Sequence, residues 1–162
     1  MIRLARPDDA AGICAVWNPI IRDSAITFNP VEKTEAAIAA LIADRAAAGH
    51  AVMVAEDGGT VLGFASYGQF RAGLGYARTM EHSINLSPAA QGRGIGARLL
   101  RAIEDHARAG GAHVMVGAVT ASNAPSVAFH RRMGYSEVGL MPDAGYKFGR
   151  YHDLLLMQKI LD

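Results

Sequence analysis

The sequence predicts an α/β fold in which a mixed sheet is flanked by helices, and three observations lead to it. The chain has 162 residues, about the length of one domain, so residues 1–162 are expected to form a single unit. Strand-like and helix-like patterns follow one another in the order β-α-α-β-β-β-α-β-α-β-β. Two neighbouring strands are joined by a Gly-Gly turn, which makes an antiparallel hairpin. The sheet is therefore not built from βαβ units throughout.

The first three elements are a short strand and two helices. Ile2–Ala5 is predicted to be the strand, and Asp8 or Asp9 can cap the following helix. That helix has an apolar stripe made of Ile13, Val16, Trp17, Ile20 and Ile21. Thr34 is predicted to open the second helix and Gly49 to stop it. Its inward positions are Ile38, Leu41 and Ile42.

The middle of the chain predicts a hairpin, a further strand and the clearest helix. Ala51–Glu56 and Val61–Gln69 flank the turn Asp57-Gly58-Gly59-Thr60, which is a strong hairpin signal. Glu81–Ser87 alternates and is the next strand. Gly94–Ala109 is a helix that ends at Gly110-Gly111. Its apolar stripe is Leu99, Leu100, Ile103 and Ala107.

The last part of the chain predicts a strand, a short helix and two closing strands. His113–Val119 is rich in β-branched residues and is predicted to be a strand. Asn123 can cap a helix with Pro125 in its first turn, where a missing N–H does no harm. Tyr135–Leu140 and Tyr151–Ile160 are the closing strands.

Composition and charge exclude several classes of protein. Lys plus Arg number 16 and Asp plus Glu number 15, so bulk charge would not hold this chain on nucleic acid or a membrane. No apolar run approaches the roughly 20 residues of a transmembrane helix. The first residues lack the apolar block of a signal peptide, so a cytoplasmic protein is expected. The single cysteine, Cys14, excludes an intrachain disulfide, and the histidines show no metal-ligand spacing, so no metal is expected.

A glycine loop is the most informative stretch. After the strand that contains Ile84–Leu86, three alternate glycines (92, 94 and 96) lead into a helix with no acid in its first turn. A helix start has unpaired N–H groups and a partial positive charge, and glycines let an anion come close to the backbone. Arg93 and Arg98 add positive charge. The loop predicts a phosphate site rather than a plain tight turn.

Two common phosphate sites do not fit this loop. Gly92–Ala97 matches the loose dinucleotide pattern G-x-G-x-x-G/A, but that site needs an acidic residue about 20 positions further on. No Asp or Glu occurs between Asp105 and Glu137. A P-loop is excluded because the sequence lacks G-K-[ST].

The loop resembles the acetyl-CoA loop of the GNAT superfamily of N-acetyltransferases, [QR]-x-x-G-x-[GA], in the form Gln91-Gly-Arg-Gly-Ile-Gly96. The resemblance covers nearly the whole chain and includes the Asn-x-x-[AS]-x-x-x-[YH]-x-x-x-G-[FY] stretch from Asn123 to Tyr135. Four longer strings are similar to the phosphinothricin and methionine sulfoximine or sulfone acetyltransferases: Ala65–Arg71, Glu81–Ser83, His130–Tyr135 and Gly145–Asp153. The resemblance implies a mostly antiparallel sheet and acetyl-CoA as co-substrate.

The resemblance also implies how acetyl-CoA is held. Backbone groups of Ile84, Asn85 and Leu86 would bind the pantetheine arm, and the Leu86 N–H would polarise the thioester oxygen. The pyrophosphate would lie on Gln91, Gly92, Arg93, Gly94, Ile95, Gly96 and Ala97. Asn123, Ser126 and His130 would contact the rest of the cofactor, although Asn123 can also serve simply as a helix cap.

The reaction needs a proton acceptor for the amine and a proton donor for the departing thiolate. Many members of the superfamily have a tyrosine donor where this sequence has His130, which can donate a proton or only orient other groups. Glu81 is the first candidate for the base because it enters the strand that leads to the thioester. His82 is a second candidate, although it would point to the opposite face of the strand, and a dedicated base is not strictly required.

The resembled subgroup acts on small amino acids, so a carboxylate site is expected. Arg71 with Ala72 and Gly73 follows a strand, and a guanidinium can bind a carboxylate through two hydrogen bonds. Phe28 is a candidate wall of the pocket or an ordinary core residue. Lys147 and Arg150 lie in a subgroup-specific string without an assignable role.

Three functions remain open at this point. The first is an acetyl-CoA-dependent N-acetyltransferase acting on the α-amine of phosphinothricin, methionine sulfoximine, methionine sulfone or a related small amino acid. The others are acetylation of a protein N-terminus or lysine, and a non-catalytic acyl-CoA-binding regulator. The resemblance implies a homodimer paired through C-terminal strands, where the apolar run Leu154–Met157 can pair subunits or form a buried central strand.

Overall fold

A single seven-stranded sheet organises the protein, and the computed structural model describes residues 1–162 of it. The strands lie in the order β1-β2-β3-β4-β5-β7-β6, and every neighbouring pair is antiparallel except β4 and β5. In chain order the elements are β1 (Ile2–Leu4), α1 (Ala10–Asp23), α2 (Glu35–Ala47), β2 (Val52–Asp57), β3 (Thr60–Gln69), β4 (Thr79–Leu86), α3 (Ile95–Ala109), β5 (Val114–Thr120), α4 (Ala124–Arg132), β6 (Ser136–Lys147) and β7 (Arg150–Ile160). The predicted class and order of elements are confirmed.

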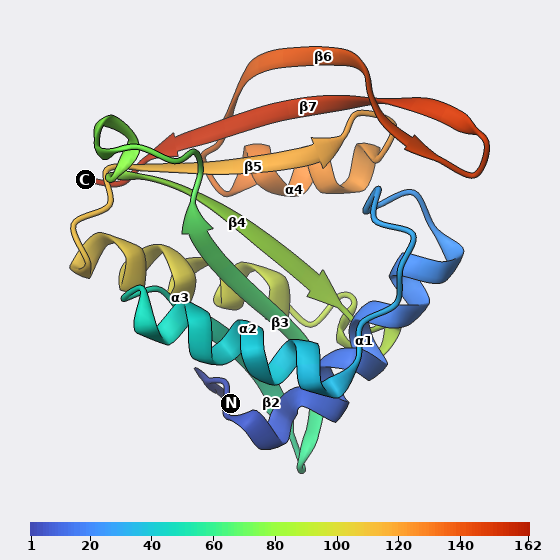
Figure 1. The fold of residues 1–162 in the computed structure, drawn as a ribbon, viewed down its shortest axis with the longest axis vertical. Helices are drawn as coiled ribbons and strands as arrows, with labels where there is room; N and C mark the ends of the chain where they lie inside the picture. Colours follow the sequence, from blue (N-terminus) through green and yellow to red (C-terminus); the bar gives the residue numbers. More distant parts are fainter.

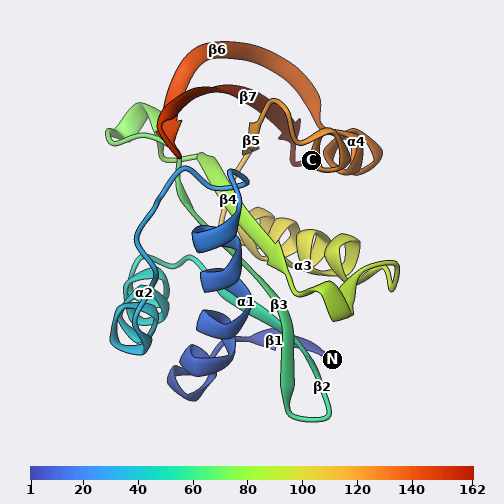
Figure 2. The same ribbon diagram turned by 90° about the vertical axis from the view of Figure 1, so that its right-hand side faces the viewer.

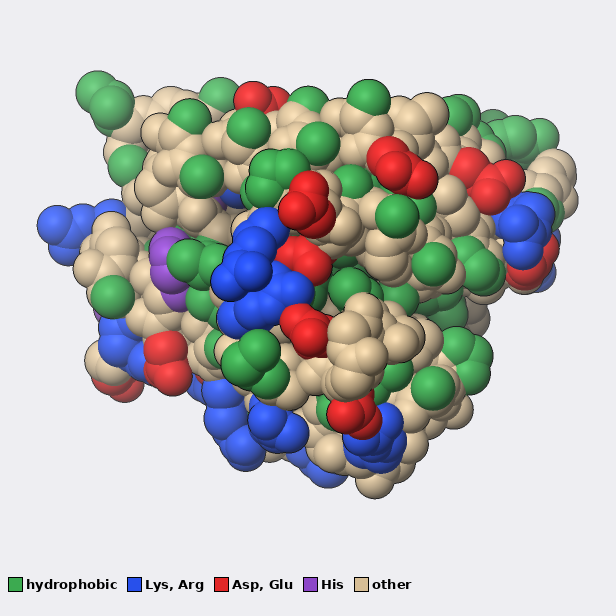
Figure 3. Space-filling view, turned by 90° about the horizontal axis from the view of Figure 1, so that it is seen from below, with side chains coloured by type: hydrophobic (Ala, Val, Ile, Leu, Met, Phe, Trp, Pro, Cys, Tyr) green, Lys and Arg blue, Asp and Glu red, His purple; other side chains and the backbone are tan.

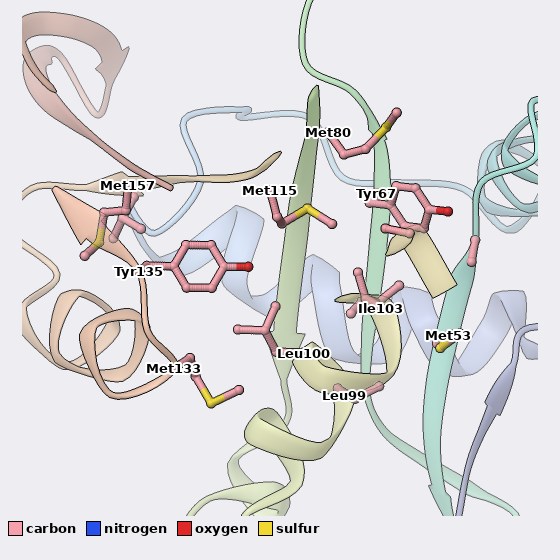
Figure 4. Close-up of a cluster of buried hydrophobic side chains, with 14 of the residues drawn as sticks. Met53, Tyr67, Met80, Leu99, Leu100, Ile103, Met115, Met133, Tyr135 and Met157 are labelled. Carbon is pink, nitrogen blue, oxygen red and sulfur yellow. The ribbon is translucent and has the colours of Figure 1, made fainter. Parts of the chain in front are cut away.

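Helices cover both faces of the sheet, with α1 and α2 on one side and α3 and α4 on the other (Figure 2). The larger apolar cluster packs α3 against the sheet through Leu99, Leu100 and Ile103, all fully buried. Figure 4 shows these three side chains beside methionines of four strands, Met53, Met80, Met115 and Met157, and near Tyr135, which directly precedes β6. The smaller cluster lies under α1 and α2. Helix α3 thereby fixes the glycine loop, which directly precedes it, against the sheet.

The turn and cap signals act locally as predicted. Gly58 and Gly59 both have positive φ, 56° and 83°, which a two-residue hairpin turn requires. The Thr34 hydroxyl accepts from the N–H of Ala37 at the start of α2. The prediction for Asp9 is wrong in its detail, because its carboxylate binds the Arg3 guanidinium and the N–H of Arg6 instead of capping α1.

Strand β6 is longer than the predicted Tyr135–Leu140. It continues to Lys147, where the Phe148-Gly149 turn leads into β7. Its register with β7 shifts between Met141 and Gly145. Apolar and polar residues therefore do not alternate regularly along this half of the strand, and the sequence lacks the usual strand pattern there. Together β6 and β7 form a long hairpin, the β6–β7 arm, which curves over one end of the molecule (Figure 1).

The run Leu154–Met157 lies in β7, between β5 and β6. Leu155 and Met157 are buried inside this chain. The run is therefore part of an interior strand, and the prediction that it pairs two subunits is corrected in favour of the buried-strand alternative.

The sheet divides where β4 and β5 part. Their parallel pairing ends at His82 and Gly117, although β4 runs on to Leu86 and β5 to Thr120. Figure 1 shows the two strands diverging from this point. A gap therefore opens in the middle of the sheet, at the place where the sequence analysis put the thioester.

The surface shows no single dominant charge. In the view of Figure 3, basic and acidic side chains lie side by side over one face of the molecule. No helix of the protein combines the length and apolar character that a membrane crossing requires.

Candidate active site

Backbone groups of β4 are open toward the gap. The Ser87 N–H donates to the Leu62 oxygen, so these two residues form a hydrogen-bonded pair of the β3–β4 ladder. Such pairs alternate in an antiparallel ladder, so Ile84 and Leu86 direct their N–H and C=O groups away from β3. Because β5 has already diverged, these groups face the gap. This is the position expected for the Leu86 N–H as a donor to an oxyanion.

The gap between β4 and β5 contains a cavity of about 240 Å³. Its lining gathers predicted residues from β4, α4 and the loop after α1, namely Phe28, Glu81, Ile84, Asn85, Asn123, Ser126 and His130. His82 lines it as well. Predicted residues that are up to about a hundred positions apart in the chain thus share one hollow.

His82 and His130 form a stacked pair on the side of the cavity that faces α4. Their ring centroids are 5.1 Å apart with nearly parallel planes. The Ser126 carbonyl can only accept, so His130 carries its proton on Nδ1, 2.8 Å from that oxygen. The unprotonated Nε2 of His130 then accepts from the Nε2–H of His82 at 3.2 Å. The Nδ1 of His82 is left buried, without a proton and without a partner.

Both imidazoles are held neutral. Burial, and secondarily the charge of His130, lowers the pKa of His82 to about 3. Burial also lowers the pKa of His130, although the bond to Ser126 and the carboxylate of Glu104 act in the opposite direction. Each ring is therefore a neutral imidazole with a single N–H in the resting protein. A ring that gives up this proton must receive another at its second nitrogen to stay neutral.

Gly117 makes room for the pair. A Cβ on this β5 residue would lie 3.1 Å from ring atoms of both His82 and His130. No motif predicted the contact between the two histidines. A glycine in the middle of the β-branched stretch His113–Val119 was the signal, since such a glycine often marks a close approach.

A buried polar group stands behind the pair. The Tyr135 hydroxyl donates to Glu104 at 3.0 Å, and Lys159 binds the other oxygen of that carboxylate at 2.7 Å. The Tyr135 ring meets both imidazoles edge-on. This group fixes the inner wall against which the histidines stack.

Glu81 lies on the face of β4 opposite to His82, as the alternation of side chains along a strand predicts. Burial raises the pKa of its carboxyl above the usual range, and the positive charge of Arg45 acts against that rise. Arg45 reaches the site from α2 and covers Gly68, the β3 partner of Glu81, so closely that a side chain at 68 would overlap the guanidinium. Arg45 does not line the cavity, but its charge acts on Glu81, and no motif in the sequence predicted this approach. A carboxylate with a raised pKa suits a base acting near neutral pH.

Asn123 has both roles that the sequence left open. Its side-chain oxygen accepts from the N–H of Ser126 at 3.3 Å, which caps α4, and the residue also lines the cavity.

A second hollow of about 450 Å³ lies at the glycine loop. It contains nearly all of the residues predicted for the pyrophosphate, namely Gln91, Gly92, Gly94, Ile95, Gly96 and Ala97, together with Leu86. Gly94 has a left-handed φ of 68°, and no side chain caps α3. Arg101 and Arg132, which the sequence analysis did not place at a site, also line this hollow.

Arg93 departs from its expected place. Its guanidinium binds Asp57 at 2.8 Å and faces a different hollow, which it shares with Arg98. An exposed ion pair of this kind contributes little stability, so it restrains Arg93 only weakly.

The Arg71 segment is also outside the cavity. Arg71, Ala72 and Gly73 lie in an exposed loop after β3, with the guanidinium over the Tyr76 ring at 5.5 Å. The Gln69 side chain donates to the Arg71 and Gly73 oxygens and shapes this loop. The structure does not bring Arg71 to the other site residues within one chain.

The two hollows together fit acetyl-CoA. The first turn of α3 contains no acidic residue, and no side chain caps it. Its first backbone N–H groups are therefore free to bind a pyrophosphate. Strand β4 and helix α4 border both hollows, and the open backbone groups of Ile84 and Leu86 lie along that path. No group of three or more His, Cys, Asp or Glu side chains is placed to hold a metal ion.

Comparisons with known proteins agree with this arrangement. The chain matches the acetyltransferase (GNAT) family over residues 17–135. It is 41% identical to an L-methionine sulfoximine/L-methionine sulfone acetyltransferase of Pseudomonas aeruginosa, over 99% of this chain and 94% of the relative. A ribosomal-protein-alanine N-acetyltransferase structure from Brucella melitensis is similar at a TM-score of 0.96 and 37% identity, covering 99% of each chain. A phosphinothricin acetyltransferase from Sinorhizobium meliloti in complex with acetyl-CoA has a TM-score of 0.93 and 31% identity, covering 99% of this chain and 88% of that one.

Proposed function

The chain belongs to the acetyltransferase (GNAT) family, and we propose that it transfers the acetyl group of acetyl-CoA to the α-amine of a small free amino acid. One observation carries the proposal. A cavity of about 240 Å³ has a carboxylate of raised pKa on one side and a neutral histidine pair on the other, next to a phosphate-binding loop. Methionine sulfoximine, methionine sulfone and phosphinothricin are the substrates that the similar proteins suggest.

Glu81 is the proposed base. Acetyl-CoA supplies an acetyl group activated as a thioester, and an amine must be neutral to attack it. An α-amino group has a pKa of about 8, so a carboxylate with a raised pKa can take its proton directly or through water. The Leu86 N–H, open toward the gap, would stabilise the negative charge that develops on the acetyl oxygen.

His130 is the proposed acid, with His82 as its proton supply. In the resting protein the Nδ1–H of His130 is bound to the Ser126 carbonyl, so it must leave that bond to reach the departing sulfur. The Nε2–H of His82 then moves to the Nε2 of His130, and water in the cavity, which His82 lines, returns a proton to the Nδ1 of His82. The amine proton that Glu81 took passes to solvent, so protons and charges balance and each ring ends as the other neutral tautomer.

A second candidate is acetylation of an N-terminal alanine, which the similarity to the Brucella melitensis structure favours. The size of the cavity favours a free amino acid instead. It lies below the roughly 300–1,000 Å³ of drug-sized pockets. Trp17 and Phe28 line it, where a polypeptide would need an open groove.

Two subunits are proposed to pair through the β6–β7 arm. Its outward residues are large, apolar and about half exposed, namely Val138, Leu140, Met141, Tyr146, Phe148 and Tyr151. Such a cluster is typical of an interface between subunits. Light scattering should give twice 17.1 kDa, and a mass near 17.1 kDa would contradict the pairing.

An acetylation assay with purified protein tests the function. Free methionine sulfoximine, methionine sulfone and phosphinothricin should be acetylated with saturation, and a peptide starting with alanine should not. Glu81→Gln should lower kcat and remove the rise of activity with pH, because the carboxylate is the active form of the base. Glu35→Gln, the same change at an exposed position in the first turn of α2, should change neither. Acetylation of the peptide alone would favour the second candidate.

A further inference from the structure

Only two positions of strand β6 face inward. Gly145 and Lys147 are buried, while the rest of the strand is exposed or, at Gly139, half-buried. A buried glycine and a buried lysine on an otherwise open strand call for a specific reason, because lysine is almost never fully buried unless it is paired. The reason lies in what these two residues touch.

Lys147 binds the segment that follows α1. Its ammonium donates to the backbone oxygens of Ile21, Ser24 and Thr27 at 2.5, 2.6 and 2.8 Å. An ammonium has three N–H donors, so all of them are used. The first two acceptors belong to the end of α1, where a positive charge is also favoured by the helix dipole.

The β6–β7 arm also supports Phe28, the residue that follows Thr27. The Phe28 ring lies so close to Gly145 that a Cβ at 145 would overlap it. His152 of β7 stacks on Phe28 at 5.6 Å, and its Nε2–H donates to the Lys147 oxygen at 3.0 Å. Figures 1 and 2 show the chain after α1 reaching the turn of the arm.

This segment is one wall of the cavity. Ile26, Thr27 and Phe28 line it, and the hydroxyl of Thr120, at the end of β5, donates to the Ala25 oxygen at 2.7 Å and lies 3.2 Å from the Ile26 oxygen. The wall, residues 25–28, has no regular secondary structure of its own, so side chains of other elements determine its position. Lys147 binds the wall directly at the Thr27 oxygen and fixes the chain just before it at Ile21 and Ser24, without touching the cavity itself.

We propose that Lys147 is a positioning residue that sets the wall at residues 25–28 and thereby the fit of the amino-acid substrate. The inference rests on the proposed function only for the identity of that substrate. Acetyl-CoA lies along β4 and the glycine loop in this arrangement. Loss of Lys147 should therefore change the site of the amine and leave the site of the cofactor intact.

Lys147→Met is the first test, because methionine keeps the length and removes the charge and donors. We expect KM for the amino acid to rise at least tenfold and KM for acetyl-CoA to stay within twofold. Lys147→Arg keeps the charge and should recover part of the loss. Arg3→Met is the matched control, since it removes another half-buried cation with two ion pairs, on β1 at the far edge of the sheet. It should lower the melting temperature without changing either KM.

Two further measurements keep the inference testable. Gly145→Ala leaves Lys147 in place, displaces Phe28 and should raise the same KM. Hydrogen exchange of the Ser24 and Ile26 amides, which donate to the Ile20 oxygen and the Ser24 hydroxyl, should become at least tenfold faster in Lys147→Met and less so in Lys147→Arg, and this measurement needs no substrate. If wild-type protein acetylates no amino acid, the proposed function fails and hydrogen exchange still decides the role of Lys147. Unchanged exchange in a folded variant, or equal changes in both KM values, would overturn the inference.

Discussion

Replacing Gly117 by alanine should both destabilise the protein and slow the reaction. The added Cβ would lie 3.1 Å from Cδ2 and Nε2 of His130 and from Nε2 of His82. Carbon contacts are favourable at about 3.5–4.0 Å, so both rings must move by several tenths of an ångström. The 3.2 Å bond between the two imidazoles is already near the upper limit and would break.

The size of the effect follows from three contributions. Overpacking a tight site costs about 1–3 kcal/mol. Loss of the hydrogen bond adds about 0.5–1.5 kcal/mol. Alanine in a strand recovers about 0.5–1 kcal/mol relative to glycine. The net loss in the free energy of unfolding is about 0.5–4 kcal/mol. Each kcal/mol lowers the melting temperature by about 2–4 °C in a chain of this length.

Thermal unfolding and steady-state kinetics of two variants provide the assay. Gly139→Ala is the control, because a Cβ there meets nothing within 4 Å. It should melt at or above the wild-type temperature, while Gly117→Ala melts lower and has a reduced kcat with an unchanged Kd for acetyl-CoA. Equal melting temperatures and equal kcat values in the two variants would refute the role given to the histidine pair.

Three other predictions concern pH, the cofactor and the substrate. Burial lowers the pKa of His82 to about 3, so on acidification from about pH 6 to pH 4 the unfolded chain gains a proton there that the folded chain does not, and stability falls by about 1.4 kcal/mol per pH unit for that group. Urea unfolding of His82→Asn should show a correspondingly flatter dependence on pH. Gly94→Asp should weaken acetyl-CoA binding at least tenfold, about 1.4 kcal/mol, in a calorimetric titration. Gly49→Asp, at a similar positive φ outside the loop, should leave binding unchanged. Arg71 lies outside the cavity of its own chain, so the predicted carboxylate contact requires the Arg71 of a second subunit. With that contact, Arg71→Ala should lower kcat/KM about 10- to 150-fold for amino acids and little for their amides, and equal losses would contradict it.

Local signals explain how much of the fold the sequence could predict. Thr34, the Gly58-Gly59 turn and Asn123 act on their immediate neighbours, so the elements beside them were found with nearly correct ends. The second half of β6 gives no such signal. Its exposed face and interrupted pairing leave neither an alternating pattern nor a cap, and β7 defines the strand across space.

The same distinction between local signals and long-range contacts applies to the residues of the candidate site. Glu81 and His130 were found because each lies in a motif of contiguous residues. The bond between His82 and His130 depends on how α4 packs over β5. The approach of Arg45 to Glu81 depends on how α2 packs against the sheet, where the Arg45 side chain reaches Gly68 of β3. Gly117 and Gly68 lie where these side chains come close to the backbone. A glycine in the sequence indicates such a close approach, but it does not identify the residue that approaches.

The interruption in β6 also determines how another molecule can attach to the outer edge of the sheet. Between Met141 and Gly145 the ladder shifts, Pro142 has no N–H to offer, and Asp143 takes a positive φ. An incoming strand would find a broken row of hydrogen-bonding groups there and could not extend the sheet along its whole length. The apolar side chains beside the break remain available. Association at this edge therefore selects a partner by the shape of its surface, and open-ended growth by strand addition is blocked.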